Sequence, residues 1–337
     1  MADNVKPLKD KLQIYLITYN RAKCLKYTLK QIFAPNSPIR DFNITILNNA
    51  STDKTDEVIE EYQEEFPNLV HIKHSINIGG NGNIVRAFEM AGSCGKEYAW
   101  VLCDDDVFSF KGWKELENAI LEEKDIICAS NYVIRKGEFE NLAYIIPQLT
   151  FVPAIIFKTE LINNAVLTIM HESVFTAFPQ LCPVIYAINN NKKIYVLKNA
   201  IMENGAHCGQ ADEYISYTRG LSQKLLTERK SISCWVLGFC SIITMLKDKK
   251  LIKECLEKSI IYKDIYNDWV NFYLCLRGMY LNRKYFNYFY EIYRMLKLRR
   301  KIAFWFFNII YALHLGWIIN DIKAIKRLTF YFRALCD

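Results

Sequence analysis

The sequence predicts an α/β protein, in which helices cover a mostly parallel sheet, followed by a helical C-terminal region. Three observations support this class. Short apolar runs alternate with stretches of helical spacing through the first 200 residues. That alternation implies right-handed crossovers between parallel strands. Beyond about Ser222 no strand-like run remains, and the chain is rich in Tyr, Phe, Trp and Leu. We therefore expect a domain at 1–210 and a second region at 211–337.

The first half of the sheet follows from four apolar runs. Leu12–Thr18 reads as a buried strand, and the apolar residues after it recur at helical spacing until Pro35. The second strand, Asn43–Asn48, precedes the possible helix N-caps Ser51, Thr52 and Asp53. The helix after them has Val58, Ile59, Tyr62 and Phe66 on its apolar face. The third strand covers 69–74. A helix at 83–91 and the fourth strand at 98–103 follow.

The pattern is looser after residue 106. Residues 110–122 have helical spacing, two short apolar runs follow, and residues 174–189 again read as a helix. Lys192–Lys198 is the last strand-like run. The two short runs, predicted as strands, are 125–130 and 153–157.

Composition places the chain among folded proteins. With 337 residues, of which 51% are hydrophobic and 23% charged, it can bury one large core and a smaller second one. Its eleven cysteines form no CxxC pair, and we identify no signal peptide before the first strand. We therefore expect reduced thiols in the cytoplasm, without a disulfide framework or a zinc site.

The positive charge is concentrated near the C-terminus. Residues 271–337 hold twelve Lys or Arg against three Asp or Glu, so the rest of the chain carries about two net negative charges of the total of +7. The uncharged run 302–319 lies between two basic clusters, which favours a helix in the surface of an anionic membrane over nucleic-acid binding. A helix of a C-terminal bundle or of a homo-oligomer interface is the alternative.

Three adjacent carboxylates, Asp104, Asp105 and Asp106, follow the fourth strand. Like charges repel, so a cation among them would lower the cost of holding them together. Mg²⁺ and Mn²⁺ prefer carboxylate and phosphate oxygens, and open α/β sheets bind ligands beyond the carboxyl ends of their strands. The triplet therefore indicates a metal-bridged diphosphate. A polar turn that caps the following helix is the alternative.

Four motifs together resemble the family 2 glycosyltransferases of the GT-A fold. They are "TYNR" at 18–21, "NNASTDKT" at 48–55, "NIGGNGN" at 77–83 and the aspartates at 104–106. Their order and spacing match the family over residues 12 to about 200. The resemblance implies a GT-A domain that binds a nucleotide-diphospho-sugar together with Mn²⁺ or Mg²⁺.

By this resemblance the binding residues can be assigned. Asn48 departs from the aspartate that usually contacts the base, so the identity of the nucleotide stays open. His207 is either a third metal ligand or a surface-loop histidine. The expected metal ligands are Asp104, Asp106 and His207, and the expected nucleotide-sugar contacts are Thr18, Tyr19, Asn20, Arg21, Asn48, Ser51, Asn77, Gly79, Gly80, Asp104 and Asp105.

Inverting sugar transfer also needs a carboxylate that takes the acceptor proton. The family places it in an acidic pair at the start of a helix beyond the aspartates, and the matching region here offers Glu172. The alternatives are that Glu172 is only a helix N-terminal charge, or that Asp212 or Glu213 is the base.

These features lead to one expected function. It is a metal-dependent, inverting transfer of a sugar from a UDP-linked donor to a hydroxyl of a glycan or lipid-linked glycan, in the cytoplasm or on the cytoplasmic face of a membrane. A sugar-phosphate nucleotidyltransferase is the first rival, but "TYNRAKC" lacks the glycine-rich loop it requires. A catalytically silent, membrane-associated scaffold is the second.

Overall fold

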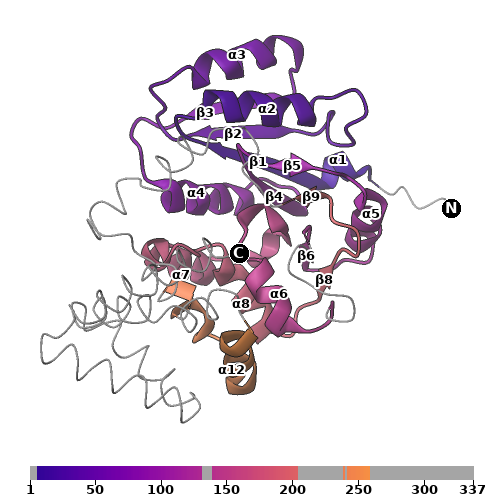
Figure 1. Cartoon of the computed structure of the whole chain (residues 1–337), viewed down its shortest axis with the longest axis vertical. Helices are drawn as coiled ribbons and strands as arrows, with labels where there is room; N and C mark the ends of the chain where they lie inside the picture. Colours follow the sequence, from indigo (N-terminus) through magenta and orange to yellow (C-terminus); the bar gives the residue numbers. More distant parts are fainter. Residues whose placement is uncertain (1–5, 131–138, 204–237, 240, 259–337) are drawn as a thin grey trace, which may run out of the picture.

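The computed structural model describes residues 6–130, 139–203, 238–239 and 241–258 (Figure 1). The predicted α/β class is confirmed. A seven-stranded sheet has the order β3-β2-β1-β4-β7-β6-β8, and β7 alone is antiparallel to its neighbours. The strands are β1 (Leu12–Thr18), β2 (Ile44–Asn48), β3 (Leu69–Lys73), β4 (Tyr98–Cys103), β6 (Ile126–Cys128), β7 (Ile155–Lys158) and β8 (Ile194–Val196).

Helices cover both faces of the sheet, as Figure 1 shows. Strand residues alternate between two cores. In β1, Leu12, Ile14 and Leu16 face one core, which α2, α3 and α5 complete, whereas Tyr15 and Ile17 face the other, which α4, α6, α7, α8 and α12 complete. The helices are α1 (Leu8–Lys11), α2 (Ala22–Ile32), α3 (Thr55–Glu65), α4 (Gly80–Gly92), α5 (Trp113–Leu121), α6 (Leu142–Gln148), α7 (Asn164–Glu172), α8 (Leu181–Asn189) and α12 (Lys249–Lys258), with 3-10 turns at Val152–Ala154, Thr159–Leu161 and Val174–Thr176.

The helix predicted at 174–189 is wrong in its first part. Residues Val174–Thr176 form a 3-10 turn, Ala177 adopts a left-handed conformation with φ of 65°, and α8 begins only at Leu181. Pro179 lies between them and disfavours a helical conformation for the residue that precedes it. The consequence for Glu172 is that it ends α7 and does not begin a helix.

A second, small sheet follows the acidic triplet. Strands β5 (Val107–Phe108) and β9 (Met202–Glu203) pair antiparallel. The sequence did not predict this pair, since two-residue strands carry no periodicity. Gly112 permits it, because a Cβ there would lie 1.8 Å from the carbonyl oxygen of Asn199.

The described part of the C-terminal region packs against the core that α6 also lines, and α12 contacts α6. Phe239, Ile243, Leu246 and Ile252 are buried there. The side-chain amide of Asn189 also donates to the carbonyl of Met245 and accepts from the backbone N–H of Lys247. Residues 238–239 and 241–258 therefore belong to the same folded body as the sheet. The apolar run 302–319 lies outside the described residues, and none of the described helices is long and apolar enough to cross a membrane.

The described cysteines differ from one expectation. Cys94, Cys103, Cys128, Cys182 and Cys255 are free thiols, as expected. Cys24, buried in α2, is disulfide-bonded. The expectation of wholly reduced thiols therefore does not hold at Cys24.

Candidate functional site

The acidic triplet lies at the carboxyl edge of the sheet. Strands β1, β2 and β4 are parallel, and their register places Thr18 opposite Asn48, and Ile17 opposite Cys103. The loops that follow these three strands therefore meet at one edge. The motifs at 18–21, 48–55 and 104–106 are thus brought together. The triplet does not cap a helix, because β5 separates it from α5.

A buried ion pair joins the first and third of these loops. Arg21 donates from Nη1 to Asp104 Oδ1 at 2.7 Å and from Nη2 to Asp105 Oδ2 at 2.8 Å. The Arg21 and Asp104 side chains are only 4% and 3% exposed. The Thr18 hydroxyl donates to the other oxygen of Asp104 at 2.7 Å. Both oxygens of Asp104 are thus used within the protein.

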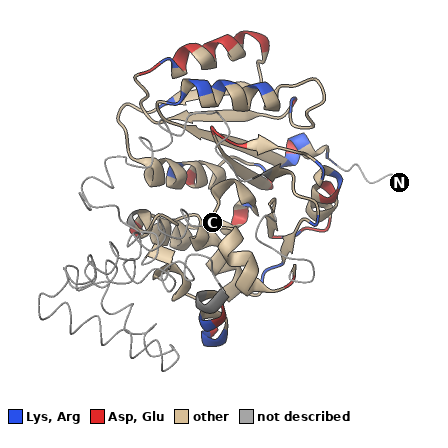
Figure 2. Cartoon of the chain, viewed as in Figure 1, with Lys and Arg blue, Asp and Glu red and all other residues tan. Residues whose placement is uncertain are grey.

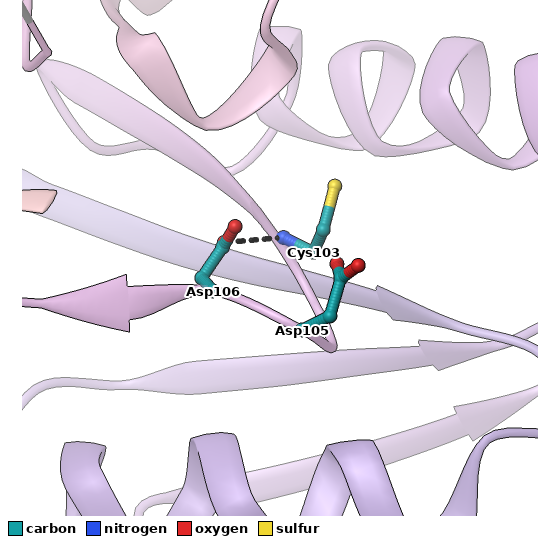
Figure 3. A group of neighbouring side chains, drawn as sticks. All are labelled: Cys103, Asp105 and Asp106. Carbon is teal, nitrogen blue, oxygen red and sulfur yellow. Dashed lines mark hydrogen bonds between the residues drawn. The ribbon is translucent and has the colours of Figure 1, made fainter. Parts of the chain in front are cut away.

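Helix α2 holds the backbone of the acidic loop. Thr28 Oγ1 donates to the carbonyl of Asp104 at 2.9 Å, and Gln31 Nε2 donates to the carbonyl of Asp106 at 3.0 Å. The N–H of Cys103 donates to Asp106 Oδ2 at 2.8 Å, which closes the loop into a turn (Figure 3). Sequence reasoning missed Thr28 and Gln31, because they lie one helical turn apart on a helix that carries no motif.

Burial shapes the protonation of the triplet. It raises the pKa of Asp106 well above its ordinary value, and the Asp105 charge adds to this. Burial also raises the pKa of Asp104, which the Arg21 guanidinium partly opposes. A cation beside these groups would favour their ionised forms.

The donor atoms fit a divalent ion. Ligand atoms of Cys103, Asp105 and Asp106 lie within 4.8 Å of one another (Figure 3). We predicted Asp104 and Asp106 as the pair of metal ligands. Asp104 binds Thr18 and Arg21, and the group of neighbouring ligand atoms contains Asp105 and Asp106, so the assignment of Asp104 as a ligand stays a prediction. The predicted ligand His207 lies outside the described residues, as do the reserve bases Asp212 and Glu213.

Asn48 is enclosed by its own loop. Its side chain is fully buried, its Oδ1 accepts the N–H of Ser51 at 2.9 Å, and its Nδ2 donates to Asp56 Oδ1 at 2.7 Å. The imidazole of His71 lies 3.5 Å from the same amide nitrogen. Burial lowers the pKa of His71 below its ordinary value, and the Asp56 charge partly opposes this. The predicted contact between Asn48 and a base would require this amide to exchange partners.

The remaining residues of the first two motifs bind each other. Asn20 has a φ of 51°, its N–H donates to Ser51 Oγ at 2.9 Å, and its Oδ1 accepts the N–H of Thr52 at 2.7 Å. Tyr19, beside it, is partly exposed. The loops after β1 and β2 therefore form one connected wall, which includes the partly exposed Tyr19.

Asn49, which the sequence analysis did not identify as a site residue, holds the glycine segment Asn77–Gly80 in place. Asn49 donates from Nδ2 to Asn77 Oδ1 at 2.8 Å and to the carbonyl of Gly79 at 3.2 Å. Gly79 has a φ of 81°, which favours glycine, and it directly precedes Gly80, the first residue of α4. A glycine is favoured at this position by the backbone conformation and not by lack of space, since a Cβ on Gly79 would meet no atom within 4 Å.

Glu172 is exposed at the end of α7. Two residues later, the carbonyl of Val174 accepts from Asn81 Nδ2 at 2.6 Å, in the first turn of α4. The segment after Glu172 thus contacts the helix that follows the glycines. Among the described residues, no hydrogen bond links Glu172 to the acidic loop.

Comparison with known proteins identifies relatives of part of the chain. Residues 13–178 match the family model described as Glycosyl transferase family 2. The abequosyltransferase RfbV of Salmonella typhimurium is 29% identical over 111 residues, which are 32% of this chain and 32% of the relative. The match thus spans about a third of that relative's length.

Two solved structures resemble the whole fold. S. aureus TarS 1–349 in complex with UDP-GlcNAc has a TM-score of 0.51 and 18% identity, covering 80% of this chain and 79% of its own. The mannosyltransferase PcManGT from Pyrobaculum calidifontis, in complex with GDP-Man and Mn²⁺, has a TM-score of 0.50 and 13% identity, covering 94% and 84%. At these identities the likeness shows the fold alone, which is GT-A.

Proposed function

We propose that this chain, which belongs to glycosyltransferase family 2 through residues 13–178, transfers a sugar from a nucleotide-diphosphate donor to a hydroxyl of a glycan or lipid-linked glycan. The observation that carries the proposal is the pair of carboxylates, Asp105 and Asp106, at the carboxyl edge of the sheet. Arg21 and α2 fix their loop against the wall formed by the other two motifs. This is where an open α/β sheet binds its ligand.

Asp105 and Asp106 would hold Mn²⁺ or Mg²⁺, and the bound ion would supply the positive charge that stabilises a departing nucleotide diphosphate. The protein's own residues do the positioning. Arg21 orients Asp105 and keeps the loop closed. The partly exposed Tyr19 offers a ring face to the base, and the segment Asn77–Gly80 borders the site on the side of α4.

Glu172 is our candidate for the general base. Its carboxylate would take the proton of the attacking hydroxyl and so direct inversion at the anomeric carbon. An exposed carboxylate suits this role, because the acceptor must reach it from solvent. The contact of Val174 with α4 supports a position near the glycine segment.

The donor is a UDP-linked sugar and the product part of a surface polysaccharide. S. aureus TarS is described with UDP-GlcNAc and PcManGT with GDP-Man and Mn²⁺, and RfbV is an abequosyltransferase. The acceptor would be presented at the cytoplasmic face of a membrane, toward which the basic region 271–337 would direct the enzyme.

Calorimetric titration of the purified chain with UDP- and GDP-sugars, with and without Mn²⁺, tests the proposal. We expect Mn²⁺ to strengthen donor binding, and Asp106→Asn to remove that gain. Asp125→Asn is the matched control, because Asp125 is also a buried aspartate but directly precedes β6, at the opposite edge of the sheet. If no sugar nucleotide binds more tightly with Mn²⁺, the proposal is wrong. Mn²⁺-dependent donor hydrolysis further separates an enzyme from a silent scaffold.

A further inference from the structure

Cys103 brings a sulfur atom to the acidic loop. It ends β4 as a free, partly exposed thiol. Figure 3 shows its Sγ and the carboxylate of Asp105 on the same side of the loop. Neither the carboxylate chemistry of the site nor the proposed transfer requires a thiol here.

The turn fixes this arrangement. The bond from the Cys103 N–H to Asp106 Oδ2 brings the first and last residues of the turn together. Arg21 donates to one carboxylate oxygen of Asp105 at 2.8 Å, and Gln31 donates to the backbone carbonyl of Asp106. A carboxylate has a second oxygen, so Asp105 and Asp106 can each keep these bonds and still bind an ion.

The spacing fits direct coordination by all three residues. Two donors on opposite sides of an ion are separated by about 4.4 Å when one bond is to sulfur and the other to oxygen. The ligand atoms of Cys103, Asp105 and Asp106 lie within 4.8 Å of one another. Donors at adjacent positions on one ion are about 3 to 3.6 Å apart, so the three side chains would have to rotate toward one another to contact a single ion.

We propose that Cys103 Sγ is a third protein ligand of the divalent ion and directs the site toward Mn²⁺ and softer ions and away from Mg²⁺. The inference rests on the proposed function, in that it concerns the ion of the same site. Mg²⁺ prefers oxygen ligands only, whereas sulfur favours softer ions such as Zn²⁺, Co²⁺ and Cd²⁺. On binding, the thiol releases its proton to solvent and the sulfur coordinates as a thiolate.

Titration of the full chain with Co²⁺ tests this inference by absorbance, independently of activity. The wild type should develop a thiolate-to-cobalt charge-transfer band in the near ultraviolet, and Cys103→Ser should lose it. Cys94→Ser is the matched control, since Cys94 is also a partly exposed free thiol but lies after α4. The preference for Mn²⁺ over Mg²⁺ should fall by about tenfold or more in Cys103→Ser and stay unchanged in Cys94→Ser.

The outcomes separate this inference from the proposed function. If Mn²⁺ strengthens donor binding equally in the wild type and in a folded Cys103→Ser variant, and the cobalt band persists, the thiol is not a ligand and the transferase proposal stands. If the wild type binds no divalent ion, with or without donor, both proposals are wrong. If Cys103→Ser does not fold, ¹¹³Cd NMR of the wild type decides, because the chemical shift distinguishes sulfur from oxygen ligands.

Discussion

At the scale of single residues, Arg21 has the largest energetic consequence. It is almost fully buried and its guanidinium bonds two carboxylates of the acidic loop. A buried charge that loses its partner is strongly destabilising, whereas loss of both partners costs much less. We expect Arg21→Met to lower the free energy of unfolding by about 3 to 5 kcal/mol, and Arg21→Met with Asp104→Asn to recover part of it. Urea unfolding of the four proteins of this cycle measures the coupling.

The exposed pair Arg86–Glu89 on α4 is the control for that cycle. Surface ion pairs contribute little to stability. Equal losses for Arg21→Met and Arg86→Met would contradict the role of Arg21.

The proposed role of Glu172 as general base can be tested by removing its carboxylate. Glu172→Gln keeps the size of the side chain but removes the basic carboxylate, so donor affinity should be unchanged while transfer falls by about 10² to 10⁴. Single-turnover transfer together with calorimetric donor binding measures both. The control is Glu160→Gln, which alters an acidic residue in another turn. Near-normal transfer by Glu172→Gln would place the base elsewhere.

His71 should make stability depend on pH. Because its pKa is lowered on folding, the unfolded chain takes up the proton first as the pH falls. The neutral ring's contribution to the free energy of unfolding is complete above about pH 6.5. It is lost as the pH falls below that value through the folded-state pKa. Thermal unfolding between pH 7.5 and pH 5 should therefore show a smaller decline in Tm for His71→Gln than for the wild type. Parallel declines would show that His71 keeps its ordinary pKa.

The residue types of the site were predictable, but their partners were not. The motifs identified Thr18, Arg21 and Asp104 as ligand contacts, whereas the structure bonds them to one another. Arg21 and Asp104 are 83 positions apart, so only the strand register brings them together. A sequence motif shows which chemistry is present and leaves open which of its groups the protein itself uses.

At the scale of elements, the segment around Gly112 positions the acidic loop. The N–H groups of Ser109 and Phe110 both donate to the carbonyl of Ile201, at 3.1 Å each, next to the β5–β9 pair. Gly112→Ala would place a methyl group against the carbonyl of Asn199, so one backbone segment must move. We expect a lower Tm and weaker Mn²⁺ binding, measured by thermal unfolding and calorimetry. Lys111→Ala, at the neighbouring exposed position, should change neither.

Elements with strong periodicity were predicted well. Strands β1, β2 and β4 followed directly from apolar runs that are buried on both faces. The antiparallel direction of β7 was not predicted, because an apolar run of four residues carries no information on strand direction. The boundary at Pro179 was missed, because the apolar residues on both sides of it continue the helical spacing across the break.

At the scale of the molecule, charge is distributed unevenly. Figure 2 shows acidic residues along α3 and basic residues along the neighbouring α2. Lys26 and Glu61 join these two helices in an ion pair. The described surface therefore offers mixed charge, and the strongly basic stretch is the sequence 271–337, which lies outside the described residues.

The whole chain should bind anionic membranes through that stretch. Basic residues on both sides of the apolar run 302–319 would interact with lipid headgroups while the run contacts the acyl region. We expect the full chain to sediment with vesicles that contain phosphatidylglycerol. High salt should release it, and the triple variant Arg299→Ser, Arg300→Ser and Lys301→Ser should bind more weakly.

The control is the triple variant Lys249→Ser, Lys250→Ser and Lys253→Ser, since these lysines are exposed on α12. Because each basic residue near such a surface contributes about 1 kcal/mol, loss of three should weaken binding by about 100-fold. Equal sedimentation of both triple variants would assign the apolar run to a contact within the protein or between copies of it.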